Sequence, residues 1–171
     1  MKKRSEDSVS TAQHQRTSVI VRTVGIISAG DMGAAIGNTL NHGGLRVITP
    51  LDGRSSLTKA RADESFIEDV GSVVELVRQA DLILSVLVPT EARIIATEVA
   101  DAMRASGTTP PFVECNAIAP KTVVSISGII ENEGAVFIDA GIIGAPPKPG
   151  SSRTRFHCSG PDTSALEALT A

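Results

Sequence analysis

A glycine-rich segment that follows an apolar run is the part of this sequence best suited to chemistry. It extends from Val24 to Gly37 and is typical of a buried strand, a tight turn and the start of a helix. Gly30 would let the backbone approach a phosphate closely, and Gly33 would let helix and strand pack tightly. Backbone amides at the helix start would then hold the anion. The spacing predicts a dinucleotide pyrophosphate site, although Ser28 replaces the first glycine of the usual G-x-G-x-x-G pattern.

The residues predicted to bind the cofactor lie in this turn and at the end of the next apolar run. From the turn they are Ser28, Ala29, Gly30, Asp31, Met32 and Gly33. About one strand and helix later, Asp52 stands where an acid reads the ribose hydroxyls of NAD. Arg54 and Ser55 follow it, and a guanidinium with a hydroxyl suits the 2′-phosphate of NADP. We predict NADP, with NAD as the alternative; a surface loop with scattered charges is the structural alternative.

The composition is typical of a single α/β domain with an aliphatic core. Of the 171 residues 42% are hydrophobic, Trp and Tyr are absent, and only four Phe occur. An aliphatic core suits a parallel sheet with helices on both faces. The net charge of −3 does not favour nucleic acid or an acidic membrane as a partner. No apolar run reaches membrane-spanning length, and Cys115 and Cys158 form no metal or disulfide pattern, which favours the cytoplasm.

Apolar runs alternate with segments of helical spacing along the chain. The expected strands are 24–27, 47–48, 82–88, 112–115 and 135–138, and the expected helices are 31–41, 72–79, 90–106, 120–131 and 162–170. Ser72 and Glu75 have the spacing of a capping box, which marks a helix start. The alternation predicts right-handed βαβ units, and hence an α/β, Rossmann-type doubly wound fold with a mainly parallel sheet and helices on both faces.

The first 22 residues differ in composition from the rest. They are rich in Lys, Arg, Ser, Thr and Gln and contain no apolar segment before Val19. A secretory signal needs such a segment, and organelle transit peptides avoid acids such as Glu6 and Asp7. We therefore expect a disordered tail over residues 1–22 and a dinucleotide-binding domain over residues 23–171.

The order of the motifs resembles the N-terminal cofactor domain of the 3-hydroxyacid dehydrogenase and 6-phosphogluconate dehydrogenase superfamily. The motifs that carry the resemblance are Gly25–Gly33, Ala80–Pro89, Glu114–Pro120 and Phe137–Pro146. Together they span about residues 23–160. The resemblance implies hydride transfer between a nicotinamide cofactor and a small hydroxy acid or a related carbonyl or imine compound.

The resemblance also implies roles for residues after the later strands. Backbone around Leu87 and Val88 would flank the adenosine, and Asn116 would lie near the nicotinamide, where an amide suits a carboxamide neighbour. The alternative for Asn116 is a helix cap or a turn former before Pro120. Cys115 is interpreted as a small core residue, because no histidine or other base is near it in sequence.

The expected substrate end departs from the family pattern. Ile143 stands where family members have a serine, and only Gly144 of their paired glycines is present. Backbone amides of Ile143 and Gly144 could still bind a substrate anion. A more apolar substrate is the equal alternative.

In the family, a lysine and an asparagine on a helix after the cofactor domain transfer the proton. No lysine of this chain has the family's surrounding pattern, so we expect part of a longer dehydrogenase that lacks the C-terminal substrate and dimerisation domain. Family members bury that second domain in a partner subunit, so the resemblance implies a homodimer. Without the domain, we expect an exposed apolar end near Leu166 and Leu169. A non-catalytic dinucleotide-binding module and a scaffold whose binding Ser28 has abolished are the alternative functions.

Overall fold

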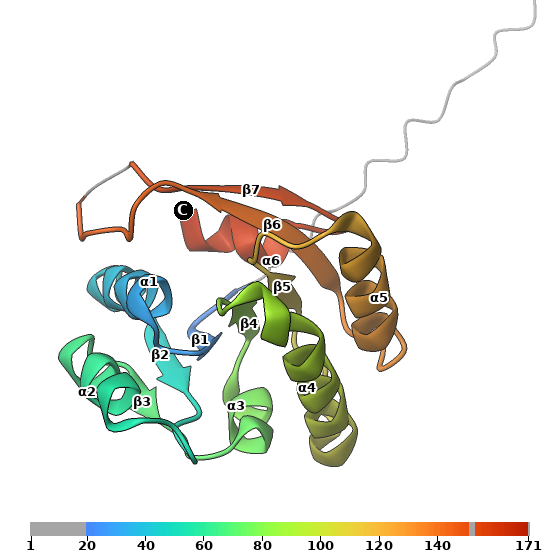
Figure 1. Cartoon of the computed structure of the whole chain (residues 1–171), viewed down its shortest axis with the longest axis horizontal. Coiled ribbons are helices and arrows are strands. Elements are labelled where there is room, and N and C mark those ends of the chain that lie inside the picture. Colours follow the sequence, from blue (N-terminus) through green and yellow to red (C-terminus); the bar gives the residue numbers. More distant parts are fainter. Residues whose placement is uncertain (1–19, 151–152, 171) are drawn as a thin grey trace, which may run out of the picture.

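Seven strands form one sheet in the order β3-β2-β1-β4-β5-β6-β7 (Figure 1). The computed structural model describes residues 20–150 and 153–170. The strands are β1 (Thr23–Ile27), β2 (Arg46–Thr49), β3 (Glu68–Asp69), β4 (Leu82–Ser85), β5 (Phe112–Glu114), β6 (Phe137–Ile143) and β7 (Arg155–Ser159). All neighbouring strands are parallel except β6 and β7. The predicted mainly parallel sheet is confirmed.

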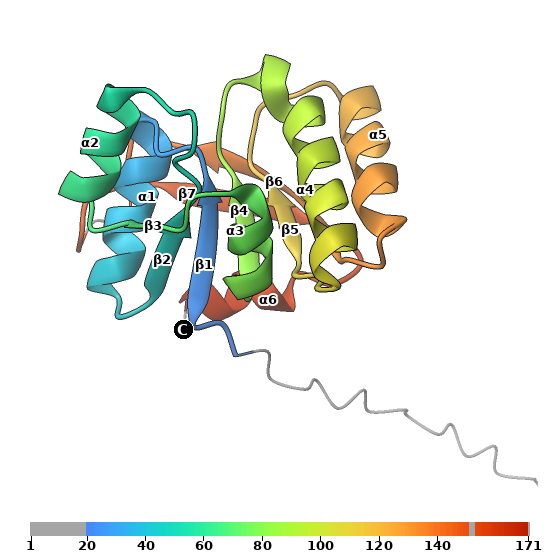
Figure 2. The same ribbon diagram turned by 90° about the horizontal axis from the view of Figure 1, so that it is seen from below.

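Helices cover both faces of this sheet (Figure 2). One face is covered by α1 (Asp31–His42), α2 (Ser56–Glu64) and α6 (Ser164–Glu167), and the other by α3 (Val73–Gln79), α4 (Ala92–Ser106) and α5 (Pro120–Glu131). Two short 3-10 turns are η1 (Pro89–Glu91) and η2 (Ala168–Thr170). Aliphatic side chains of the strands alternate between the two faces, so each face has its own core. The doubly wound Rossmann-type fold is confirmed.

Several elements differ from those expected. The strand expected to reach residue 88 ends at Ser85, because the chain leaves the sheet there, and β6 extends to Ile143 because it pairs with β7. Neither α2 nor β3 was expected, nor was β7. Of the α2 residues only Ala62 is buried, and both residues of β3 are exposed, so neither element has an apolar pattern. Ser72 caps α3 as expected, accepting from the Glu75 amide at 3.3 Å.

The predicted tail falls largely on residues 1–19, which lie outside the described residues. Of the remainder, Val21 is buried in the core. The backbone amides of Arg22 and Thr23 donate to the Asp81 carboxylate at 2.9 and 2.8 Å. These bonds attach the start of β1 to the turn before β4.

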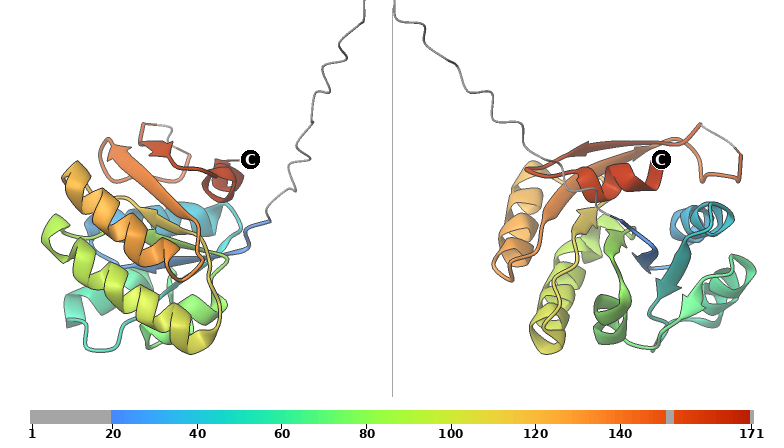
Figure 3. Two further views of the ribbon diagram at one scale, coloured as in Figure 1. Left: turned by 90° about the vertical axis from the view of Figure 1, so that its right-hand side faces the viewer. Right: turned by 180° about the vertical axis from the view of Figure 1, so that it is seen from behind.

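The expectation of an exposed apolar end is wrong for Leu166. Its exposed fraction is 6%, because α6 packs against the core on this face of the sheet and lies below β7 (Figure 3). Leu166 and Leu169 instead line a hollow of about 410 Å³ with Ile36, Leu40 and Phe156. Leu166 is therefore part of the core, and Leu169 packs against the core while partly buried.

The chain changes direction across the sheet at β1. Strands β2 and β3 lie on one side of β1, and β4 to β7 lie on the other. Loops after β1 and β4 therefore diverge above the sheet, which leaves a crevice at the carboxyl ends of these strands. Ligands of open α/β sheets bind at this reversal of strand order.

Two glycines in helices give opposite expectations for stability. A Cβ at Gly33 would lie 2.2 Å from the Ser28 carbonyl oxygen, whereas a Cβ at Gly128 would meet nothing within 4 Å. We expect Gly33→Ala to lower the free energy of unfolding by about 1–3 kcal/mol through overpacking. Gly128→Ala should raise it by about 0.5–1 kcal/mol because alanine favours helix. Urea unfolding of both variants checks this, and equal effects would contradict it.

Candidate functional site

The turn after β1 has the backbone conformation expected of a phosphate-binding loop. Ser28 has a φ of +76°, in the left-handed region that favours glycine. A non-glycine residue adopts it at a cost of about 1–2 kcal/mol. Gly30 then caps α1, and its carbonyl accepts from the Ala34 amide at 2.8 Å. The turn therefore keeps this conformation although its first glycine is a serine.

The glycines of the turn are required for different reasons. Gly33 lies against the Ser28 carbonyl, and the turn leaves no room for a side chain there. Gly30 has a φ of −71°, which any residue adopts. A Cβ on Gly30 would come no closer than 3.8 Å to another atom, the Ser28 hydroxyl oxygen. The fold does not need a glycine at position 30, and the open space above it fits a phosphate at the start of α1.

Two neighbouring hollows extend from this turn along the carboxyl edge of the sheet. The first, of about 140 Å³, is lined by Ser28, Leu87 and Val88 among others. The second, of about 390 Å³, lies at the end of β2 and is lined by Asp52, Gly53 and Gly71 among others. Arg54, Glu91 and Ile95 line both hollows, so the two form one groove from the turn to the end of β2.

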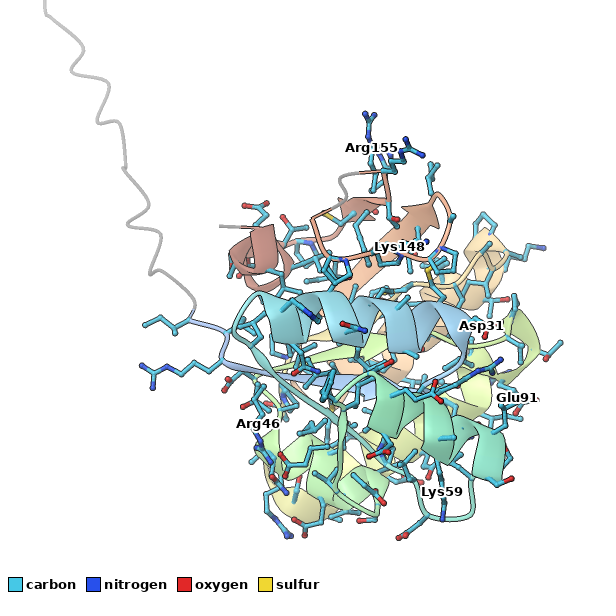
Figure 4. All side chains as sticks on the ribbon, turned by 90° about the vertical axis from the view of Figure 1, so that its left-hand side faces the viewer. Asp31, Arg46, Lys59, Glu91, Lys148 and Arg155 are labelled. Atoms are coloured by element: carbon cyan, nitrogen blue, oxygen red, sulfur yellow. The ribbon has the colours of Figure 1, made fainter. Side chains whose placement is uncertain are left out.

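The groove lies at one end of the molecule. Figure 4 shows Asp31 and Glu91 at this end and Arg46, at the start of β2, at the other. Asp31 extends from the first turn of α1 and pairs with Arg61 of α2 at 2.6 Å. Met32 is half-buried against the core, and Ala29 is fully buried. The side chains of these three residues are therefore not directed at a ligand, and their backbone amides remain the predicted contacts.

Arg54 is the cation of the groove. It is half-buried and forms no ion pair with any residue that the structure describes. Arg46, Arg61, Arg78 and Arg104, in contrast, each pair with a carboxylate. Ser55 has a local partner, because its hydroxyl caps α2 and accepts from the Thr58 amide at 3.2 Å. The carboxylate of Asp52 lies close to Gly71, within 3.4 Å of the position of a Cβ there.

A buried polar cluster lies at the ends of β4 and β5. Its centre is Glu114, which has an exposed fraction of 0%. The Ser85 hydroxyl donates to Glu114 Oε2 at 3.1 Å, and the Asn116 backbone amide donates to Oε1 at 3.0 Å. Asn116 Nδ2 also donates to Glu114 Oε1. Sequence reasoning missed Ser85 and Glu114; the signal was an acid inside the apolar run 112–115.

Burial and neighbouring charge act together on this carboxyl group. Burial raises the pKa of Glu114 above its ordinary value, hydrogen bonds from Asn116 and Ser85 lower it in part, and Asp139 raises it further. Asp139 is the residue opposite Glu114 on β6. The cluster therefore holds an acid near the site without a cation among its contacts.

Asn116 joins the loops that follow β4 and β5. Its Oδ1 accepts from the Leu87 amide at 2.7 Å, and its Nδ2 donates to Glu114 and, at 3.4 Å, to Ser85. Its side chain thus has a structural role, but not that of the helix cap that the sequence left open, because Ala119 is the N-cap residue of α5 and no side chain caps this helix. Asn116 also lines a hollow of about 350 Å³ with Pro120 and Asp139. A position near the nicotinamide stays a prediction.

The two residues predicted to bind substrate lie farther along β6. Ile143 is 61% exposed and pairs with Arg155 of β7. Gly144 has a φ of +129°, and a Cβ there would lie 3.0 Å from the Arg153 carbonyl oxygen. Neither lines the hollow beside Asn116. Their role in substrate binding stays a prediction.

Comparison with known proteins identifies the family. Residues 23–169 match the family described as the NAD binding domain of 6-phosphogluconate dehydrogenase. The chain belongs to this family. It is an oxidoreductase-type domain that binds a nicotinamide dinucleotide, and the glycine turn and the strand order independently indicate a dinucleotide site. No match was found among the curated proteins.

Solved structures of dehydrogenases and reductases share the fold. A conserved protein of unknown function, described as similar to 3-hydroxyacid dehydrogenases, is 26% identical with a TM-score of 0.74, over 86% of this chain and 54% of its own. For the 3-hydroxyisobutyrate dehydrogenase of Mycobacterium tuberculosis the identity is 20%, the TM-score 0.72 and the coverage 87% and 50%. An imine reductase from Pseudomonas sp. is 18% identical, with a TM-score of 0.69 and coverage of 87% and 50%. The chain thus spans about half the length of these proteins.

Two further properties concern the residues that the structure describes. None of their helices is long and apolar enough to cross a membrane. The described residues also contain no group of three or more His, Cys, Asp or Glu side chains that could hold a metal ion.

The two cysteines should differ in reactivity. Cys115 is buried, and burial raises the pKa of its thiol, whereas Cys158 is exposed. Because the thiolate is the nucleophile, we expect one thiol to react with a disulfide reagent in the native protein and two in denaturant. Mass spectrometry should locate the native adduct on Cys158. Rapid native labelling of Cys115 would contradict its interpretation as a core residue.

Substitution of Gly30 should separate binding from folding. In Gly30→Ala the added methyl group would meet no protein atom closely but would crowd a pyrophosphate. We expect nicotinamide dinucleotide affinity to fall at least tenfold while the denaturant midpoint stays near that of the wild type. Fluorescence titration and urea unfolding measure the two quantities. Unchanged affinity would remove Gly30 from the phosphate site.

Proposed function

We propose that this chain is the cofactor-binding part of an NADP-dependent oxidoreductase that acts on a small hydroxy acid or a related carbonyl or imine compound. The observation that carries the proposal is the space around the Gly30 backbone. Neither the backbone conformation at Gly30 nor the packing around it requires a glycine at this position. When bound, the cofactor supplies or accepts a hydride at C4 of its nicotinamide ring. The chain's own residues bind and orient it.

The proposed contacts follow the groove. Backbone amides of residues 29–33 at the start of α1 would bind the pyrophosphate. The groove lined by Arg54, Glu91 and Ile95 would receive the adenosine half, next to Leu87 and Val88. The nicotinamide half would extend the other way, over the carboxyl ends of β4 and β5.

The choice between NADP and NAD depends on the charges around Arg54. A guanidinium without an ion pair among the described residues is suited to binding a 2′-phosphate through two charge-assisted hydrogen bonds. Asp52, Glu91 and Glu98, which also line the second hollow, act against a phosphate. We propose NADP because Arg54 lines both hollows whereas the Asp52 carboxylate lies against Gly71.

The proposed substrate class and oligomeric state are taken from the family resemblance. Ile143 and Gly144 are the proposed substrate contacts, and proton transfer is not assigned to any described residue. A homodimer and a cytoplasmic location stay predictions.

Titration with NADPH and with NADH tests the proposed function. We expect nicotinamide fluorescence to report tighter binding of NADPH by the wild type. Arg54→Ala should weaken NADPH binding at least tenfold, because charge-assisted hydrogen bonds contribute about 1.5–3 kcal/mol, and should leave NADH binding nearly unchanged.

Arg22→Ala is the matched control, because it also removes one positive charge. The Arg22 side chain is exposed and lies at the end of β1 opposite to the glycine turn. Tighter binding of NADH, or an equal loss of both cofactors in Arg54→Ala, would contradict the choice of NADP. If neither NADPH nor NADH binds, the proposed function itself is contradicted.

A further inference from the structure

The Glu114 carboxyl group is the most buried acid at the carboxyl edge of the sheet. It accepts hydrogen bonds from Asn116 and Ser85, and none of the described residues forms an ion pair with it. A buried acid without a cation is unfavourable unless another group compensates it. Its hydrogen bonds to neutral donors compensate it only in part.

The position of Glu114 relates it to the proposed cofactor site. Asn116, which it contacts through both backbone and side chain, lines the hollow at the start of α5, and Leu87, bonded to Asn116, lines the groove. Glu114 therefore lies one side chain below the surface on which the nicotinamide half would rest. Asp139, its neighbour on β6, lines the same hollow as Asn116 and adds negative charge.

We propose that Glu114 tunes the site toward the oxidised cofactor, because its buried negative charge stabilises the positive charge that the nicotinamide ring carries only when oxidised. This inference rests on the proposed function. The reduced ring is neutral, so the same carboxylate leaves its binding nearly unchanged. Glu114 is then a positioning residue that also sets the ratio of the two affinities and hence the reduction potential of the bound cofactor.

A purely structural role for Glu114 would affect the affinities for the two forms of the cofactor differently from a role of its charge. The Glu114–Asn116–Leu87 chain of hydrogen bonds holds together the loops after β4 and β5. If fastening these loops were its whole role, removal of the charge would weaken binding of oxidised and reduced cofactor alike. The ratio of the two affinities separates the roles, whereas either affinity alone does not.

The pH dependence follows from the ionisation of this group. Burial raises the pKa of Glu114, and the groups that face it are Asp139 on β6, Ser85 on β4 and Asn116. Helices α4 and α5 cover this face with apolar side chains, among them Ile95 and Ile126. The preference for NADP⁺ should be complete above the pKa of Glu114 and should be lost as the pH falls through it. Binding of NADP⁺ should release protons in that range.

Glu114→Gln tests the charge with little change of shape. The glutamine carbonyl can accept from Asn116, and its amide can donate to Ser85. We expect the affinity for NADP⁺, relative to that for NADPH, to fall about tenfold, because the variant loses a unit charge that acts on the nicotinamide ring through the effective dielectric of a protein. The pH dependence of the ratio should disappear. Glu131→Gln, on the exposed end of α5, is the matched control and should keep the wild-type ratio.

Isothermal titration of both cofactors with wild type and variants gives the affinities. An unchanged ratio in Glu114→Gln, or an equal loss for both forms, overturns the inference while the proposed function stands. If the variant does not fold, the number of protons that the wild type releases on binding each cofactor tests the inference instead. Proton exchange by the 2′-phosphate is the same for NADP⁺ and NADPH, so it cancels in the difference between them. Equal proton release with NADP⁺ and NADPH then overturns the inference. Absence of binding of either form overturns the proposed function and this inference with it.

Discussion

The close approach of α1 to the turn after β1 is the constraint on which the rest of the structure depends. Gly33 lies against the Ser28 carbonyl, and this contact fixes where the helix starts relative to the strand. The amides at the helix start are thereby placed at the carboxyl edge of the sheet, beside the hollow that continues to the end of β2. The contact depends on Gly33 and on the left-handed backbone of Ser28, not on the glycine that the turn lacks.

A second set of contacts organises the other half of the site. Ser85 and Glu114 lie at the ends of two neighbouring strands, and Asn116 follows the second. Through the Leu87 amide, Asn116 connects loops that would otherwise be independent. The first half presents backbone amides and one guanidinium, whereas the second contains buried negative charge. Asp52, Glu91 and Glu98 also line the first half, so the amides and Arg54 attract an anion there against nearby carboxylates.

Elements with a strong apolar pattern could be predicted from the sequence, and those without one could not. Helix α4 was expected because Ile95, Val99 and Met103 repeat at helical spacing, and β1 because it is a continuous buried run. Helix α2 buries only Ala62, and β3 and β7 are largely exposed, so their positions depend on tertiary pairing. The glycine turn was predictable because its constraints are local. Glu114 was not, because its partner Ser85 is distant in sequence and becomes a neighbour only when β4 and β5 pair.

The attachment of Arg22 and Thr23 to Asp81 also has a mechanical consequence. Their amides reach the Asp81 carboxylate at the amino end of β1, and β1 is hydrogen-bonded to β2 on one side and β4 on the other. A pulling force directed along β1 from its amino end would load the hydrogen bonds to β2 and β4 in shear, together with the two bonds to Asp81. The glycine turn lies at the far end of the same strand and is shielded from such tension by the whole length of β1.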